Sequence, residues 1–421
     1  MDQEKNLKRE KKLPNRWAIA AAGVIMQTCL GTVYAWSVFA RPLADGHGWY
    51  LTDVTLAFTI VILSLSIAAV VGGYILDSKG PRIVATMSGI FFPIGLLVAA
   101  YGAHIGNLIV IYIGYGLICG IGLGFGYITP IATLVKWFPD KRGLVTGLAV
   151  LGFGLGSGIM AVIAPGMIDG IGVPMTLLIF GCIFFVAVLV SAQFMKNPPA
   201  GYVPEGWVPP ANAPAAEGTT LGQAVRSKHF YICWLMLFVN VMAGMAVISQ
   251  ASPMAQDFMP GTVADTAALA GILMLVFAFF NGIFRLIWAG WSDKIGRLKV
   301  FTILFASQAA LFLFLGLVPA DMPGRFPLFV ILISFQYGCL GGGFATMPAL
   351  AADKFGTKYA GRIYGWMLTA WGVAGVVGPT LYAQIREASD DYTRALLITG
   401  IVFVVALILP FLASRKKAAV A

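Results

Sequence analysis

Long runs of apolar residues divide this chain, and short polar segments separate each run from the next. Twelve runs approach or exceed the roughly 20 residues that a helix needs to cross a bilayer. The pattern therefore predicts an all-α membrane protein. Its predicted spanning helices are 17–40, 54–76, 82–103, 107–135, 142–168, 174–195, 229–255, 266–291, 298–319, 326–352, 359–385 and 393–413.

One longer polar segment lies between the sixth and seventh runs and is rich in Pro, Gly and Ala. Such a composition is typical of a linker. We therefore predict two six-helix halves with short tails. The predicted parts are a tail at 1–16, a first half at 17–196, a linker at 197–227, a second half at 228–413 and a tail at 414–421.

The composition supports a membrane environment. Hydrophobic residues make up 59% of the chain and charged residues 11%, whereas a soluble domain carries about 25% charged residues. The five cysteines lie inside apolar runs without disulfide or metal-ligand spacing, so no metal is expected. The glycine strings lack a following Gly-Lys-Ser/Thr, which predicts close helix packing rather than a nucleotide or another cofactor.

Basic residues are distributed unequally between the two sides of the predicted bundle. With both termini and the linker on one side, that side holds 23 of the 28 Lys and Arg residues. This bias predicts that both termini are cytoplasmic. The net charge of +10 thus reflects membrane topology and not nucleic-acid binding. The basic residues on the opposite side are Arg41, Arg325, Arg386 and Arg394.

The chain also repeats itself. The loop after the second run, 73–82, resembles the loop after the eighth, 290–297. Asp77 and Asp293 are 216 residues apart, and Gly80 and Gly296 have the same separation. Two halves related in this way predict a pseudo-symmetric transporter bundle.

These motifs resemble those of a known family. The loop 73–82 resembles the signature of the major facilitator superfamily, with departures at Ser78 and Pro81. The segments 137–144 and 281–297 are similar to motifs of monocarboxylate transporters and of oxalate–formate antiporters. The resemblance covers nearly the whole chain. It implies the major facilitator fold and a bacterial inner-membrane transporter, monomeric, that carries a lactate-type monocarboxylate together with a proton.

The resemblance also implies that the repeated loops hold the cytoplasmic ends of neighbouring helices together. An aspartate there can pair with a nearby cation and accept bonds from a helix N-terminus. The residues expected to form this latch are Asp77, Gly80, Arg82, Arg142, Asp293, Gly296 and Arg297.

Arg285 is the only basic residue that falls on neither side. It precedes Asp293 by eight residues, which places it about 12 Å into a hydrocarbon core of about 30 Å. A charge at that depth must face the protein interior. No acidic residue lies near the middle of any run. We therefore predict that the anion bound by Arg285 is the substrate, since a guanidinium can donate two bonds to one carboxylate. The alternative is a structural arginine bonded to backbone carbonyl groups of broken helices.

Other polar residues are candidates for the same site. Asn281 lies one helical turn from Arg285 and can contact the substrate or orient the guanidinium. Three tyrosines match positions that line the cavity of oxalate–formate antiporters, and a fourth, Tyr382, is a weaker candidate. The three are Tyr34, Tyr127 and Tyr337.

Two departures from the relatives bear on the substrate. Oxalate–formate antiporters carry a second cation, a lysine, where this chain has Trp371, and a single central cation favours monocarboxylates over dianions. Asn281 replaces an aspartate that is linked to proton coupling in eukaryotic relatives, so that step does not carry over. Carboxylate exchange and a non-transporting carboxylate receptor remain alternatives. Paired carboxylates and nucleophile–base spacings are absent from the runs, so an enzyme is not expected.

Overall fold

The computed structural model describes residues 13–199, 201–208, 218–258, 266–319, 322–389 and 391–414. Within these ranges the chain is helical, with turns and short extended segments but no strand. Most of both predicted tails, together with residue 200 and residues 209–217 of the predicted linker, lies outside the described residues.

The first half is built from helices that cross the membrane six times in the described residues. Its first crossing combines three segments, its fourth combines three, and α8 supplies both the fifth and the sixth. The elements are α2 (Arg16–Gly31), η1 (Thr32–Ala35), α3 (Trp36–His47), α4 (Leu51–Lys79), α5 (Pro81–His104), α6 (Leu108–Ile111), η2 (Tyr112–Cys119), α7 (Gly120–Trp137) and α8 (Arg142–Phe194).

The second half follows the short linker helix α9 (Leu221–Val225) and repeats the arrangement. Its eleventh crossing is shared by α14 and α15, and its twelfth by α16 and α17, so the described chain makes twelve crossings. The elements are α10 (Lys228–Phe258), α11 (Thr266–Ile295), α12 (Arg297–Leu317), α13 (Arg325–Phe355), α14 (Ala360–Met367), α15 (Thr369–Ser389), α16 (Thr393–Ala406) and α17 (Ile408–Ser414).

Most helices extend beyond the apolar runs that predicted them, whereas α12 ends at Leu317, before the end of the predicted run 298–319. For example, the run 54–76 corresponds to α4, which continues to Lys79. The fifth and sixth runs are joined in one 53-residue element that bends where Gly172 adopts a φ of 80°. Ten stretches of the described chain are individually long and apolar enough to span a membrane. The number is ten and not twelve for two reasons. The element α8 contains two of the predicted spans but counts once, and the eleventh predicted span, divided between α14 and α15, is not among the ten.

The repeated loops share one backbone feature. Gly80 and Gly296 have φ values of 89° and 98°, and each separates two helices. An added Cβ would meet nothing within 4 Å at either position. Glycine is therefore required there for its left-handed conformation and not for space.

Small residues bring α7 close to its neighbours. A Cβ on Gly122 would overlap the backbone of Phe92 in α5, and a Cβ on Gly124 would overlap the carbonyl group of Leu65 in α4. The glycine string in this helix therefore permits close packing. This packing positions Tyr127, which follows three residues after Gly124 and is fully buried.

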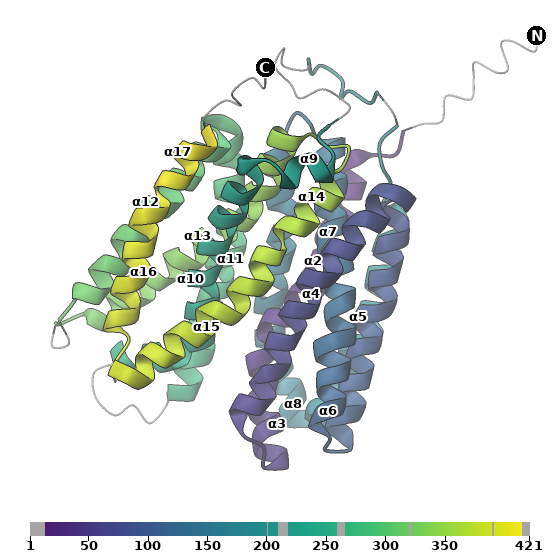
Figure 1. Ribbon diagram of the computed structural model, residues 1–421. Helices are drawn as coiled ribbons and strands as arrows, with labels where there is room; N and C mark the ends of the chain where they lie inside the picture. The colour runs from purple at the N-terminus through teal and green to yellow at the C-terminus, as the bar shows by residue number, and fades with distance from the viewer. Residues whose placement is uncertain are drawn as a thin grey trace, which may run out of the picture.

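Figure 1 shows the first half on the right and the second half on the left. The beginning of α2 and the end of α17 lie at the same end of the molecule. The two halves approach each other there, where α14 lies beside α4, and α15 and α4 diverge toward the opposite end (Figure 1).

Candidate functional site

Arg285 lies on α11 in the middle of the molecule, and only 1% of its surface is exposed. Its Nε and Nη2 donate to the Asn281 side-chain oxygen at 3.2 and 2.9 Å. Its Nη1 donates to the carbonyl oxygen of Val150 in α8 at 3.1 Å. Both acceptor oxygens are neutral, and no carboxylate of the described residues pairs with this guanidinium. Its positive charge is therefore hydrogen-bonded but not neutralised.

Asn281 fixes the direction of the guanidinium. It is 4% exposed, and its amide nitrogen donates to the carbonyl oxygen of Tyr337 in α13 at 2.8 Å. The amide cannot rotate without losing that bond. Its oxygen therefore stays in place to accept two of the five N–H groups of Arg285. Together with the bond to Val150, these bonds use three of the five N–H groups and leave one on Nη1 and one on Nη2.

Five aromatic side chains form a cluster beside the guanidinium of Arg285. The Arg285 guanidinium carbon lies 5.8 Å from the ring centre of Phe153 and 5.6 Å from that of Phe344. Further rings pack edge to face on these two, with centroid distances from 4.8 to 6.3 Å. We call the aromatic cluster the five residues Tyr34, Tyr127, Phe153, Phe344 and Trp371, which come from both halves.

Polar atoms in and beside the aromatic cluster lack partners. The hydroxyls of Tyr34, Tyr127 and Tyr364 and the indole nitrogen of Trp371 are buried and make no hydrogen bond of good geometry. Tyr34 is nevertheless near Trp371, and Tyr127 is near Tyr364 and Arg285. Arg285 is within electrostatic range of all three hydroxyls. Buried polar groups normally find partners. These four buried donor groups beside an uncompensated cation therefore form a site suited to an anion with several acceptor atoms.

The structure does not bring every predicted tyrosine to Arg285. The ring of Tyr337 stacks on Phe277 at 4.8 Å, and this residue reaches the site through its carbonyl oxygen, which holds Asn281. The hydroxyl of Tyr382 is bonded to Thr399 of α16 at 2.8 Å. Tyr382 therefore faces the interior of the second half, and its predicted role in binding is supported by no contact with Arg285.

Sequence reasoning missed several residues of the site, namely Phe153, Phe344, Tyr364 and the carbonyl group of Val150. The two phenylalanines follow or interrupt glycine strings that were interpreted as packing segments. An aromatic residue within an apolar run gives no signal that separates a site residue from the core. The signal available for Tyr364 was its polar hydroxyl within a predicted spanning run, near the beginning of α14 at Ala360.

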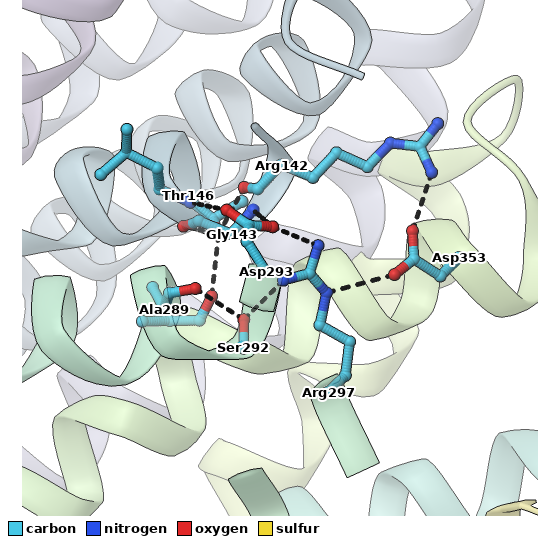
Figure 2. A network of polar contacts seen from close by, with 10 residues as sticks. Arg142, Gly143, Thr146, Ala289, Ser292, Asp293, Arg297 and Asp353 are labelled. Atoms are coloured by element: carbon cyan, nitrogen blue, oxygen red, sulfur yellow. Dashed lines mark hydrogen bonds and ion pairs between the residues drawn. The ribbon is translucent and has the colours of Figure 1, made fainter. Parts of the chain in front are cut away.

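The latch predicted from the repeated loops involves two aspartates in equivalent positions. Asp293 at the end of α11 accepts the backbone N–H groups of Gly143 and Leu144 at 2.9 and 2.8 Å (Figure 2). Asp77 near the end of α4 accepts those of Gly361 and Arg362 at 3.3 and 2.8 Å. Each carboxylate thus caps the first turn of a helix in the other half, where the helix dipole favours a negative charge.

Basic side chains strengthen the contact at Asp293. Arg297 pairs with Asp293 in the same half and with Asp353 at 3.2 Å. Arg142, from the first half, pairs with Asp353 at 2.8 Å (Figure 2). Arg82 is not part of either contact, because it donates to the carbonyl oxygen of Gln193 within its own half at 2.8 Å.

A narrow void lies between the latch and the Arg285 site. It is enclosed by α7, α13 and α14 and lined by small and apolar side chains, including Ala132, Pro348, Ala352 and Ile363. Tyr364 also lines it, and the same residue lies within electrostatic range of Arg285. Tyr364 therefore borders both the void and the surroundings of Arg285.

Known proteins resemble this chain over most of its length. The family model of the Major Facilitator Superfamily matches residues 21–259 and 244–420. An oxalate:formate antiporter of Oxalobacter formigenes is 27% identical, with 92% of this chain and 89% of that protein covered. Human monocarboxylate transporter 11 is 24% identical, with 91% and 80% covered.

A solved structure shares the fold. The Escherichia coli fucose:proton symporter FucP superposes with a TM-score of 0.71 at 14% identity, covering 94% of this chain and 98% of that one. At this identity the likeness concerns the arrangement of the helices alone.

Proposed function

Because this chain belongs to the Major Facilitator Superfamily, a superfamily of multi-pass membrane transporters, we propose that it carries small monocarboxylates such as lactate across the membrane by alternating access. The observation that most supports this proposal is the buried Arg285, whose described acceptors are all neutral. An anionic substrate would supply the missing negative charge. The unpaired hydroxyls around it would supply bonds to the remaining oxygen atoms.

The site favours one negative charge and a small molecule. Arg285 is the one cation among the described residues of the site, so a dianion would leave about one charge uncompensated in a medium of low dielectric. The aromatic cluster packs tightly around the guanidinium, which limits the length of the apolar part of the substrate. Relatives named as an oxalate:formate antiporter, an apicoplast pyruvate carrier and a monocarboxylate transporter agree with a small carboxylate.

Substrate binding would be linked to movement of the two halves through Arg285. Its Nη1 bonds to Val150 of the first half, whereas its Nε and Nη2 are held within the second half. An anion bound to the guanidinium would neutralise the charge that opposes burial and so allow the halves to close around it. To open the site toward the latch end, the two halves would then have to release the Asp77 and Asp293 contacts.

We place both termini and the latch on the cytoplasmic side, in agreement with the distribution of basic residues. In this arrangement the bundle consists of a first half at 17–196 and a second half at 228–413, joined by the linker at 197–227. We assign the protein to a bacterial inner membrane and treat it as a monomer. A proton would accompany the anion, released or taken up near Arg285 through the substrate carboxylate, since Asn281 cannot titrate.

Uptake by proteoliposomes containing Arg285→Gln tests the proposal. We expect lactate uptake to fall by roughly 30-fold or more, because loss of one partner from a buried charged pair costs about 2–5 kcal/mol. Arg394→Gln, a change at an exposed arginine, should retain uptake. Near-normal transport by Arg285→Gln, with an unchanged melting temperature, would refute the assignment.

The same proteoliposomes distinguish the alternatives. Symport should respond to an imposed pH gradient without internal substrate, whereas carboxylate exchange requires substrate inside. A receptor would bind radiolabelled lactate without accumulating it.

A further inference from the structure

A second cavity lies far from Arg285, at the surface where α2 begins and α8 ends. Its volume is about 350 Å³. Asn15, Gln193 and Lys196 supply its polar lining, and Ala18 and Phe194 are among its apolar lining residues. Since α2 begins at the end of the molecule that also carries the latch, the cavity opens at one of the two membrane interfaces.

The cavity carries a positive charge. No acidic residue lines it, and the Lys196 ammonium pairs with no carboxylate in the part of the chain that the structure describes. The exposed Arg82 is held at its rim by a 2.8 Å bond to the Gln193 carbonyl oxygen. The nearby Arg16 adds no net charge, because it is bonded twice to Asp140, at 2.8 and 3.2 Å.

An apolar track continues from the cavity along α8. Val186, Val190 and Phe194 are 62%, 55% and 48% exposed. Their four-residue spacing places them on one face of the helix. Trp17, 43% exposed at the start of α2, is a residue type that concentrates at the membrane interface. A charged pocket at the interface thus adjoins an apolar surface that faces the hydrocarbon.

We propose that this cavity binds the phosphate group of an anionic phospholipid. Lys196 and Arg82 would hold the phosphate through charge-assisted bonds, and the amide groups of Asn15 and Gln193 would bond the polar remainder of the headgroup. One acyl chain would lie along Val186, Val190 and Phe194. Basic pockets between helices at the cytoplasmic interface are suited to such headgroups. This inference does not depend on which substrate Arg285 binds.

Binding of defined lipids to the purified, delipidated protein tests the proposal. Native mass spectrometry would measure the affinity for phosphatidylglycerol, for phosphatidylcholine and for inorganic phosphate. We expect a clear preference for phosphatidylglycerol. The double variant Lys196→Gln/Arg82→Gln should weaken it by about fivefold per lost cation, since one cation near an anionic surface contributes about 1 kcal/mol. Affinity for phosphatidylcholine, whose phosphate charge is offset by its choline cation, should fall less.

Two further variants control for charge and folding. Lys299→Gln removes an exposed lysine at the start of α12 and should leave lipid affinity as it is. Lys196→Arg keeps the charge and should retain the preference for phosphatidylglycerol. Equal affinity of the wild type and the double variant for phosphatidylglycerol would overturn the proposal. Equally tight binding of inorganic phosphate alone would also overturn it, because the site would then select a free ion.

Discussion

The amide of Asn281 determines what Arg285 can offer a ligand. One oxygen accepts two N–H groups of the guanidinium, and the amide is itself anchored to the backbone of α13. The guanidinium is therefore pre-organised, and a substrate would not need to order it on binding. Asn281 differs in this from a carboxylate, which would neutralise Arg285 and leave no charge for the substrate to compensate.

Two substitutions at Asn281 separate these roles. Asn281→Ala removes the acceptor for Nε and Nη2, and we expect the KM for lactate to rise by roughly 10-fold or more, because a hydrogen bond to a charged group contributes about 1.5–3 kcal/mol. Asn281→Asp supplies an internal anion that competes with the substrate, so uptake at pH 7 should fall below that of Asn281→Ala. Concentration-dependent uptake would measure both. Faster uptake by the aspartate variant would contradict this account.

Tyr364 contributes a hydroxyl without a partner and a ring that borders the void toward the latch. Tyr364→Phe removes only the hydroxyl, so we expect a several-fold rise in the KM for lactate with the maximal rate nearly unchanged. Tyr364→Ala also removes the ring, and the maximal rate should change as well. Initial rates at several lactate concentrations distinguish the two. Identical kinetics for both variants would argue against separate roles for the hydroxyl and the ring.

At the scale of elements, the packing of α8 on α11 places the site between the halves. A Cβ on Gly154 would lie 2.7 Å from the Cα of Gly282 and 3.4 Å from the side-chain oxygen of Asn281. One turn further along α8, a Cβ on Gly158 would make ordinary contacts of 3.8 Å with Ala278 and Leu275. The two glycines are thus a matched pair on one helix, of which only the first lacks room for a side chain.

Gly154→Ala should therefore impair transport although it removes no polar atom. Overpacking of this kind costs about 1–3 kcal/mol, and it would move α11 together with Asn281 away from α8. We expect uptake to fall roughly 10-fold, whereas Gly158→Ala should transport at the wild-type rate. Reconstituted uptake and the melting temperature of both variants check this expectation. Similar activity of the two variants would show that this contact does not determine the geometry of the site.

The helices themselves could be predicted from the sequence because the thickness of the membrane sets the length of each apolar run. Their rotation about their own axes could not. Tyr34 and Tyr382 both lie in spanning segments, yet one joins the aromatic cluster and the other bonds to Thr399. Arg285 was identified because a charge within an apolar run is exceptional, whereas Phe153 and Phe344 resembled core residues. Side-chain direction depends on packing between halves, which the apolar pattern does not encode.

At the scale of the whole molecule, the internal repeat produces a reciprocal closure. Asp77 of the first half caps α14 in the second, and Asp293 of the second half caps α8 in the first. The two aspartates are 216 residues apart, and each lies in a loop of the same kind, three residues before a glycine with positive φ. A single kind of contact, used twice, therefore holds both halves together at one end.

Loss of both carboxylates should open this end. In the double variant Asp77→Asn/Asp293→Asn, each helix N-terminus loses a charged acceptor. Because a charge at a helix terminus contributes about 0.3–2 kcal/mol, the two losses should shift the equilibrium between the closed and the open form of this end several-fold. A cysteine at Ala352, which is 2% exposed and lines the void, reports on this shift in a background without native cysteines. We expect a membrane-impermeant maleimide to label it several-fold faster in the double variant, in vesicles that expose the latch.

Asp45→Asn, at an exposed carboxylate of α3, should leave the labelling rate unchanged. Equal labelling with and without the two carboxylates would mean that the contacts between apolar helices, and not the latch, keep the halves together.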